Sequence, residues 1–235
     1  MSKRIAIMQP YFLPYIGYWQ LMNAVDQFVI YDNIQFTKKG WINRNRFLLN
    51  SQPQTFTLPL KKDSDYLDVS ERYLSDIHDE HVKKLLRQFE AAYAKTPHFY
   101  EGVKLLRECL LFNDKNLFNF VYHSIKTVRD YLSIDTELVI SSSLDIDHDL
   151  RSAEKVKAIC HNLNADTYIN PHGGVDLYDK DDFDAENLTL KFLKPQEIEY
   201  DQNQSGHTPW LSIIDLIMFC RKSEIQQKLS EFDYL

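Results

Sequence analysis

The sequence contains few of the residues that mark several classes of protein. It has three cysteines in 235 residues, Cys109, Cys160 and Cys220, which lie far apart and form no Cys-x-x-Cys pair. This spacing argues against a disulfide framework and a cysteine-based zinc site, and favours burial of the thiols as small apolar side chains. Only six glycines are present, and there is no repeat, low-complexity tract or Gly/Ser linker. We therefore expect one unit covering residues 1–235.

Long apolar runs are also missing. No stretch approaches the roughly 18 uncharged apolar residues that a membrane span requires. The first residues, Met1-Ser2-Lys3-Arg4, lead directly into a strand-like segment without a separate apolar targeting region. We expect a soluble, cytoplasmic protein. A net charge of -7 disfavours an extended nucleic-acid surface. The oligomeric state stays open, with a homo-oligomer among the alternatives.

Apolar residues make up 44% of the chain and aromatic residues 13%, which is enough for a full core. Residues 4–8 and 27–31 are short apolar runs typical of buried strands, and residues 15–25 between them are typical of a helix. Two buried strands joined by a helix favour a parallel pair with a right-handed crossover. Residues 41–60 alternate in polarity, which predicts a β-ribbon that ends at Pro59.

Apolar residues recur at helical intervals between residues 69 and 132, with breaks at Thr96-Pro97 and around Asn113-Asp114. This pattern predicts three or four helices in an insert over about residues 67–132. Strands are then expected at residues 136–140, 166–169 and 188–192. Helices are expected at residues 152–163, 210–219 and 224–232. The predicted fold class is α/β, a mainly parallel sheet that carries a helical insert.

The loop after the first strand places a helix start behind the strand, where backbone N–H groups bind phosphate or carboxylate. Gly17 would allow close approach by a ligand or by the sheet. The alternative is a rigid turn with aromatic packing. The layout resembles the HIGH-type nucleotidylyltransferase arrangement, which implies a Rossmann-like (HUP) sheet, although tyrosine follows the glycine here instead of histidine. The candidate binding residues are Gln9, Tyr11, Tyr15, Gly17 and Tyr18.

The loop after the second strand is strongly basic. Its cationic side chains fit phosphate or carboxylate, and its amides supply directional hydrogen bonds. Asp32 stands at the strand end, where a carboxylate serves as a base or orients a sugar hydroxyl, an amine or Mg²⁺. The alternative is a solvated basic hairpin with Asp32 in a turn. The candidate binding residues are Gln35, Lys38, Asn43, Arg44 and Arg46.

Later loops add further candidates. After the strand at residues 166–169, His172 is a candidate acid or base, Gly173 permits backbone approach to a ligand, and Asp176 would orient it. A surface turn is the alternative for all three. Ser212 and Asp215 share a helix face at i, i+3, where they either bind substrate or act as a cap and a core polar group. We expect no metal site, because residues 145–149 lack the glycine and distal glutamate of a calcium loop.

Several segments together resemble the WbqC-like protein family. They are residues 9–18, residues 32–46, the Gly173-Gly174 loop and residues 211–216. The resemblance extends from about residue 4 to residue 220. It implies a place in bacterial O-antigen and other surface-polysaccharide gene clusters, and a role in modifying amino sugars.

Three functional hypotheses follow. The first is an enzyme that transfers an acyl or aminoacyl group to the amine of a nucleotide-linked amino sugar, with Asp32 or His172 as the base. The second is a nucleotidylyltransferase or adenylate-forming enzyme, which would need Mg²⁺ as a cofactor. The third is a noncatalytic accessory protein that binds a sugar nucleotide.

Overall fold

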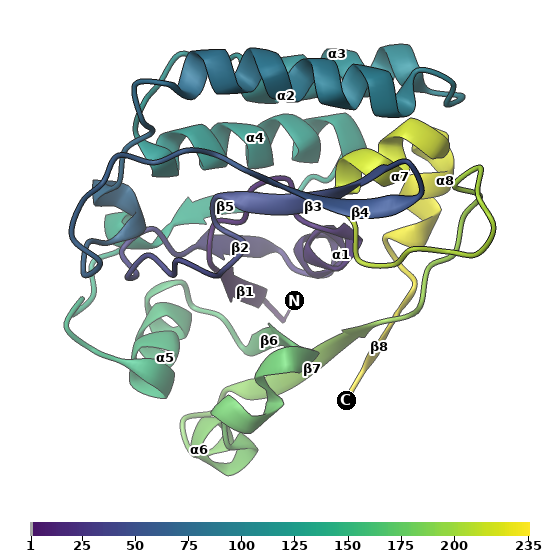
Figure 1. Cartoon of the computed structure of the whole chain (residues 1–235). Helices are drawn as coiled ribbons and strands as arrows, with labels where there is room; N and C mark the ends of the chain where they lie inside the picture. The colour runs from purple at the N-terminus through teal and green to yellow at the C-terminus, as the bar shows by residue number, and fades with distance from the viewer. Residues whose placement is uncertain (1) are drawn as a thin grey trace.

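A six-stranded, mostly parallel sheet runs through the middle of the molecule (Figure 1). The computed structural model describes residues 2–235. The strand order is β5-β2-β1-β6-β7-β8; the first five strands are parallel, and β8 is antiparallel to β7. The α/β class predicted from the sequence is confirmed. The strands are β1 (Arg4–Met8), β2 (Gln27–Ile30), β5 (Glu137–Ile140), β6 (Thr167–Pro171), β7 (Thr189–Pro195) and β8 (Phe232–Tyr234).

The predicted unit of strand, helix and strand at the amino end is confirmed. Helix α1 (Ile16–Asn23) joins β1 to β2, which pair in parallel from Ile5 opposite Gln27 to Met8 opposite Ile30. β1 is apolar on both faces because the central strand is covered by helices on both sides. The chain crosses from β1 to β2 and β5 on one side and to β6 and β7 on the other, so the direction of winding reverses at β1.

Three long helices lie between β4 and β5, in the segment where helices were predicted, and they stack over one face of the sheet (Figure 1). Each turns an apolar stripe inward, which places Phe89, Leu106 and Phe120 in the core. The opposite face of the sheet carries α5 (Ser152–Asn162) and α6 (Lys180–Asp184), with a separate apolar cluster around Ile159. The long helices are α2 (His78–Tyr93), α3 (Phe99–Leu110) and α4 (Leu117–Leu132).

The predicted β-ribbon is also present. β3 (Arg44–Leu49) and β4 (Gln52–Thr57) pair antiparallel as a separate two-stranded sheet, which lies in front of the main sheet in the view of Figure 1. Its inner face packs on α2, where the rings of Phe47 and Phe89 stack with centroids 4.4 Å apart. This packing fixes the ribbon over the loops that leave the sheet.

The predictions for the last thirty residues need correction. Helix α7 (Ile213–Phe219) begins three residues later than predicted, because Ser212 caps it and Trp210 has a positive φ of 61°. Helix α8 (Lys222–Lys228) begins and ends earlier than the predicted helix at residues 224–232, and β8 begins at Phe232, the last residue of that predicted helix. β8 has only three residues, too few for a periodic signal, and is held by pairing with β7. Helix α6 was not predicted.

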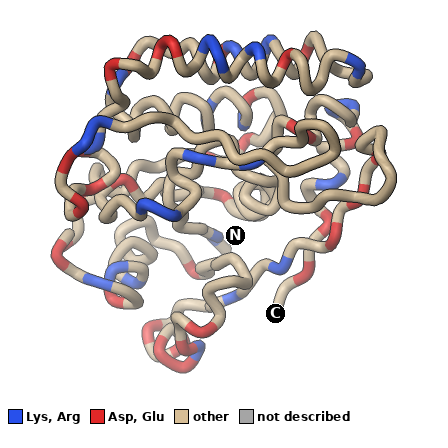
Figure 2. Tube along the Cα trace, viewed as in Figure 1, with Lys and Arg blue, Asp and Glu red and all other residues tan. Residues whose placement is uncertain are grey.

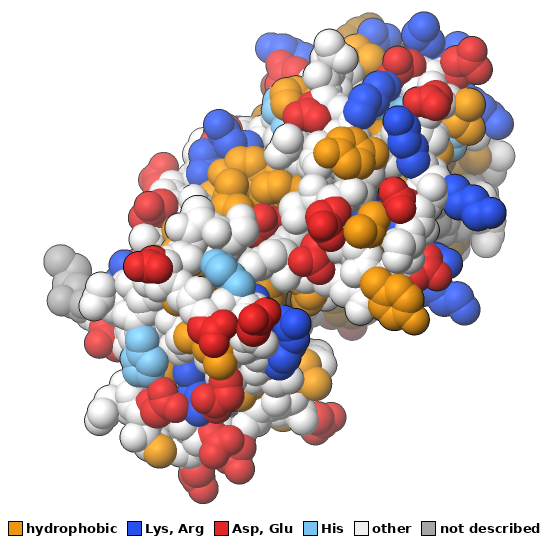
Figure 3. All heavy atoms as spheres, turned by 90° about the vertical axis from the view of Figure 1, so that its left-hand side faces the viewer, with side chains coloured by type: hydrophobic (Ala, Val, Ile, Leu, Met, Phe, Trp, Pro, Cys, Tyr) orange, Lys and Arg blue, Asp and Glu red, His pale blue; other side chains and the backbone are white. Residues whose placement is uncertain are grey.

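Charged side chains are spread over the molecule. Acidic residues gather around α6, and Lys and Arg residues are distributed along the outer helices (Figure 2). The face seen in Figure 3 narrows between a larger and a smaller lobe, and side chains of both charge signs lie together near this waist. Among residues 2–235, no helix is both long enough and apolar enough to cross a bilayer.

His78 makes the stability of the fold dependent on pH. Its side chain is buried edge-on against Phe120 with ring centroids 5.0 Å apart, and burial lowers its pKa from 6.5 to about 4. Between these values the unfolded chain binds the proton and the folded chain does not, so stability falls as the pH falls from 6.5 to 4. The difference between the two pKa values corresponds to about 3 kcal/mol in the free energy of unfolding.

We expect His78→Gln to remove this loss, measured by urea unfolding at pH 7 and pH 4.5. Acidic groups elsewhere also titrate, so the measure is the difference between the two proteins. Parallel curves of stability against pH for the variant and the parent chain would contradict the expectation.

Candidate functional site at the carboxyl edge of the sheet

The loop after β1 and the ribbon are joined by hydrogen bonds at the carboxyl edge of the sheet. Phe12 N–H donates to the Trp41 carbonyl at 3.1 Å. The buried Asn45 amide donates to the carbonyls of Phe12 and Leu13 at 3.1 and 2.8 Å. Leu13 has a positive φ of 46°, so the loop bends sharply here and Asn45 holds the bend. The first two loops that were predicted to bind a ligand therefore meet.

The start of α7 completes this junction. Ser212 Oγ donates to the Leu13 carbonyl at 2.7 Å, and its N–H donates to the Arg46 carbonyl at 2.8 Å. Ile213 N–H donates to the Pro14 carbonyl at 3.0 Å. Ser212, a candidate binding residue, is 1% exposed and fixes α7 against both the loop and the ribbon. Its position is that of a buried helix cap, the alternative to substrate binding that the sequence left open.

These three segments enclose a cavity of about 310 Å³, which we call the aromatic pocket. The rings of Tyr15 and Trp210 meet edge to face with centroids 5.5 Å apart. The Arg46 guanidinium lies over the Trp41 ring, 5.6 Å from its centroid. Trp41 and Trp210 are 38% and 54% exposed, so ring surface is open to a ligand. The pocket is lined by Tyr11, Pro14, Tyr15, Trp41, Asn45, Arg46 and Trp210.

The electrostatics of the aromatic pocket favour an anion. Arg46 Nη2 donates to the Trp210 carbonyl at 3.1 Å, whereas its buried Nε has no partner among residues 2–235. Burial raises the pKa of Tyr11 and Tyr15, so both phenols stay protonated and are hydrogen-bond donors. No carboxylate is among the described residues that line the pocket. The pocket thus combines an uncompensated cation with aromatic surface.

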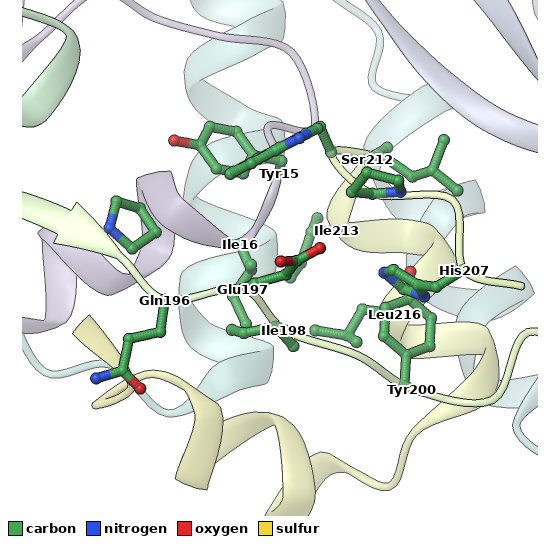
Figure 4. Close-up of a pocket in the computed structure, with 14 residues that line it drawn as sticks. Tyr15, Ile16, Gln196, Glu197, Ile198, Tyr200, His207, Ser212, Ile213 and Leu216 are labelled. Carbon is green, nitrogen blue, oxygen red and sulfur yellow. The ribbon is translucent and has the colours of Figure 1, made fainter.

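A smaller cavity of about 40 Å³ lies on the other side of Tyr15 and Trp210. Glu197, Tyr200 and His207 surround it (Figure 4). Its size fits one or two water molecules rather than a substrate. His207 Nδ1 is buried without a partner in the described chain, which is the kind of group that such a water would satisfy.

Asp215, the other candidate on α7, lies behind this cavity and is 0% exposed. Its carboxylate accepts hydrogen bonds from Tyr93 at 2.6 Å, Tyr200 at 2.5 Å and Gln202 at 3.1 Å. Burial raises the pKa of Asp215, and these three hydrogen bonds oppose that effect. Because Tyr93 Oη also accepts from Leu48 N–H at 3.1 Å, the network joins α2, α7, the ribbon and the loop that carries Trp210. Asp215 is therefore a buried acceptor whose hydrogen bonds hold the pocket walls together.

Asp32 lies at a second opening on the same edge, but its side chain is 96% buried. Its Oδ1 accepts from Ser141 Oγ and Ser142 N–H, both at 2.9 Å. Ser141 also donates to Asn33 Oδ1 at 2.5 Å. The three serines that follow β5, Ser141–Ser143, form a 3₁₀ turn. Asp32 ties the ends of β2 and β5 together, a position that does not suit the predicted base.

Above Asp32 lies an open cleft of about 700 Å³, which we call the polar cleft. Gln35, a predicted binding residue, lines it. His148 also lines it, with Nδ1 facing the Asn33 amide at 2.9 Å and Nε2 facing the Leu144 carbonyl at 3.1 Å. With the Asn33 amide donating to Nδ1 and the Leu144 carbonyl facing Nε2, the hydrogen bonds favour the tautomer that carries its hydrogen on Nε2. The cleft is lined by Tyr31, Asn33, Ile34, Gln35, Tyr66, Asp68, His148, Asp149, Arg151, Ser152, Val156 and Tyr178.

Other predicted binding residues hold the loops in shape. Lys38 pairs with Asp65 at 2.8 Å on the surface. Asn43 is buried and donates to the Leu58 carbonyl at 2.9 Å. The Arg44 guanidinium donates to the carbonyls of Gly40 and Lys39. Of the predicted basic clamp, only Arg46 lines the aromatic pocket.

Gly17 and Tyr18 are also explained by packing. A Cβ at Gly17 would lie about 2.4 Å from the Tyr15 ring, so the glycine makes room for that ring and not for a ligand. Tyr18 is buried, and its hydroxyl donates to the Gln9 carbonyl at 3.2 Å. Gln9 is half-buried and lines neither cavity.

The predicted turn after β6 lies outside both cavities. His172, Gly173 and Asp176 are exposed and belong to a 3₁₀ turn. None of them lines the aromatic pocket or the polar cleft. This arrangement corresponds to the surface-turn alternative.

Sequence reasoning missed several residues that line the cavities. Trp210 was interpreted as the start of a helix, and Asp68, Arg151 and Tyr178 carried no motif. One signal was available for Arg151, since it directly precedes a predicted amphipathic helix that follows a strand. Such positions lie at the carboxyl edge of a parallel sheet.

Comparison with known proteins identifies the family of this chain. The model of the WbqC-like protein family matches residues 9–227. The chain belongs to the WbqC-like protein family. It is similar to the uncharacterized protein Rv1507c of Mycobacterium tuberculosis (strain ATCC 25618 / H37Rv), with 28% identity over 217 residues that cover 92% of this chain and 93% of the relative. No solved structure matches it. Within this WbqC-like chain, the matched region includes both cavities.

Proposed function

We propose that this protein transfers an acyl or aminoacyl group to the amine of a nucleotide-linked amino sugar. The observation that carries the proposal is the aromatic pocket, in which Arg46 meets four aromatic side chains at the carboxyl edge of the sheet. Bases and sugar rings stack on aromatic faces, and guanidinium groups bind phosphate in two-pronged fashion. A sugar nucleotide supplies both features in one molecule.

The topology supports the same ligand class. Counted along the chain, the six strands of the main sheet have the order 3-2-1-4-5-6. This is the order of doubly wound, dinucleotide-binding sheets, whose ligands bind outside the carboxyl ends of the strands where the winding reverses. We infer a Rossmann-like sheet of this kind. Tyr11 follows β1, where the winding reverses, and lines the aromatic pocket.

The reaction forms one bond and breaks another. The amine nitrogen of the sugar attacks the carbonyl carbon of an activated donor, such as a thioester or an acyl phosphate. A C–N bond forms, the bond to the activating group breaks, and the proton that the amine loses goes to the departing thiolate or phosphate. Arg46 would hold the diphosphate, and the Tyr11 and Tyr15 hydroxyls would orient it. Neither Asp32 nor His172, the two bases predicted from the sequence, is placed to take this proton, because the first is hydrogen-bonded in the core and the second lies outside the cavities.

The arrangement offers less support for nucleotidylyl transfer. The residue after the helix-start glycine is Tyr18, whose hydroxyl is bound to the Gln9 carbonyl inside the protein. It therefore cannot replace the histidine that stabilises the phosphates in the HIGH-type arrangement.

The test is turnover with purified protein. UDP-, dTDP- and GDP-linked amino sugars are incubated with thioester, acyl phosphate and aminoacyl donors, and products are followed by mass spectrometry. We expect one sugar nucleotide to gain the mass of an acyl or aminoacyl group, and Trp41→Ala to reduce the rate by about tenfold or more. The absence of product with every pair, together with no binding of any sugar nucleotide, would refute the proposal. Binding without turnover would favour the accessory-protein alternative.

A further inference from the structure

The polar cleft carries charges of opposite sign that come from different segments. Asp68 lies after the ribbon, next to the 3₁₀ turn η1 (Val69–Glu71). Asp149 and Arg151 come from the connection between β5 and α5. Lys155, one turn into α5, is 1% exposed, and its Nζ donates to the His148 carbonyl at 2.8 Å. Two carboxylates and one cation, Arg151, thus line the opening, and Lys155 lies buried behind its wall.

These charges do not neutralise one another directly. Within the described part of the chain, Asp68, Asp149, Arg151 and Lys155 form no ion pair at salt-bridge distance. They are nevertheless close enough to interact, since burial raises the pKa of Asp68 while Lys155 and Arg151 oppose that rise. Likewise, burial lowers the pKa of Lys155 while Asp68 and Asp149 oppose the decrease. Opposite charges therefore face each other across open space.

A ligand with a single sign of charge suits this space poorly. An anion would bind near Arg151 but would also meet the carboxylates of Asp68 and Asp149. A cation near those carboxylates would meet the repulsion of Arg151 and Lys155. A ligand with one charge of each sign, a few ångströms apart, satisfies both sides. The Tyr31 and Tyr178 rings supply apolar wall for the rest of such a molecule.

We infer that the polar cleft binds a small zwitterion of the α-amino acid class, with its carboxylate toward Arg151 and its ammonium toward Asp68. The inference rests on the proposed function, because it makes the donor aminoacyl rather than simple acyl. The cleft of about 700 Å³ is much larger than an amino acid, so it has room for an activating group on the carbonyl. In a donor activated as an acyl phosphate, the anionic phosphate would take the place of the carboxylate beside Arg151.

The test measures binding of free amino acids to the full chain. The common L-amino acids and glycine are compared by thermal shift, and the best of them is measured by calorimetry beside its amide and its N-acetyl derivative. We expect the zwitterion to bind about tenfold or more tightly than either singly charged analogue. Arg151→Gln should weaken binding of the amino acid by a similar factor but should not weaken binding of the cationic amide, which loses a repulsive neighbour. Asp68→Asn should likewise weaken binding of the amino acid but not that of the anionic N-acetyl derivative.

Two exposed residues outside the cleft, Arg87 and Asp135, provide matched controls. Arg87→Gln and Asp135→Asn remove the same charges, and amino acid binding should not change. No binding by any amino acid, or equal binding by the zwitterion and its analogues, would overturn the inference. Binding of a sugar nucleotide is measured in parallel. If it persists without amino acid binding, only the aminoacyl inference fails. If amino acids bind and no sugar nucleotide does, the proposed function fails instead.

Discussion

Replacement of Asp215 by alanine is expected to lower the free energy of unfolding by about 3 to 5 kcal/mol. The Asp215 carboxylate is fully buried and accepts hydrogen bonds from Tyr93, Tyr200 and Gln202. Alanine leaves these donors in the core without an acceptor, and each orphaned donor costs free energy. Urea unfolding followed by circular dichroism measures the change.

Asp135→Ala, at an exposed position, is the control and should shift the unfolding free energy by less than about 0.5 kcal/mol. Asp215→Asn keeps an acceptor oxygen and should fall between the two. Tyr200 and Gln202 hold the loop that carries Trp210, so Asp215→Asn should also weaken ligand binding in the aromatic pocket. A loss below about 1 kcal/mol for Asp215→Ala would show that the network adds little.

Replacement of Arg46 by glutamine is expected to weaken binding of a sugar nucleotide by about 10- to 100-fold, which corresponds to about 1.4 to 2.8 kcal/mol. Arg46 is the only cation among the described residues that line the aromatic pocket. Glutamine retains a hydrogen-bond donor but removes the charge and the planar fork. Calorimetry with the sugar nucleotide that gives product measures the effect.

Lys38→Gln is the matched control, since it removes a positive charge from the same loop outside the pocket. It should change affinity by less than about twofold, because exposed charges are screened. Arg46→Lys keeps the charge without the fork and should give an intermediate loss. If Arg46→Gln and Lys38→Gln weakened binding equally, the general charge of the ribbon would be responsible rather than the pocket.

The architecture was predicted correctly from the sequence where the apolar periodicity was strong. β1, α1 and β2 were predicted within two residues at each end, and the ribbon and the three long helices were expected where they occur. The short element β8 was missed because its formation depends on β7, a partner about forty residues away. Local patterns cannot reveal a strand that tertiary pairing alone determines.

The site was harder to predict than the fold. The β1 loop and the ribbon meet because both follow buried neighbouring strands of a parallel sheet, whose carboxyl ends lie at one edge. The sequence did not indicate which polar side chains remain free to bind a ligand. Asp32, Asn43 and Arg44 form hydrogen bonds with backbone and hydroxyl groups that only the folded chain brings close. Trp210 reaches Arg46 across 164 residues of sequence, a distance that no local motif spans.

The junction at Leu13 also sets when the pocket can form during synthesis. Its carbonyl receives Asn45 from the ribbon and Ser212 from a point 199 residues further along the chain. During synthesis, Arg46 is therefore made 164 residues before Trp210, which belongs to the last wall of the pocket. Until Trp210 is in place, Arg46 and the other aromatic rings of the pocket remain exposed to solvent. We expect a chain truncated before Trp210 to lose ligand binding in the aromatic pocket, because one wall of the pocket is then missing.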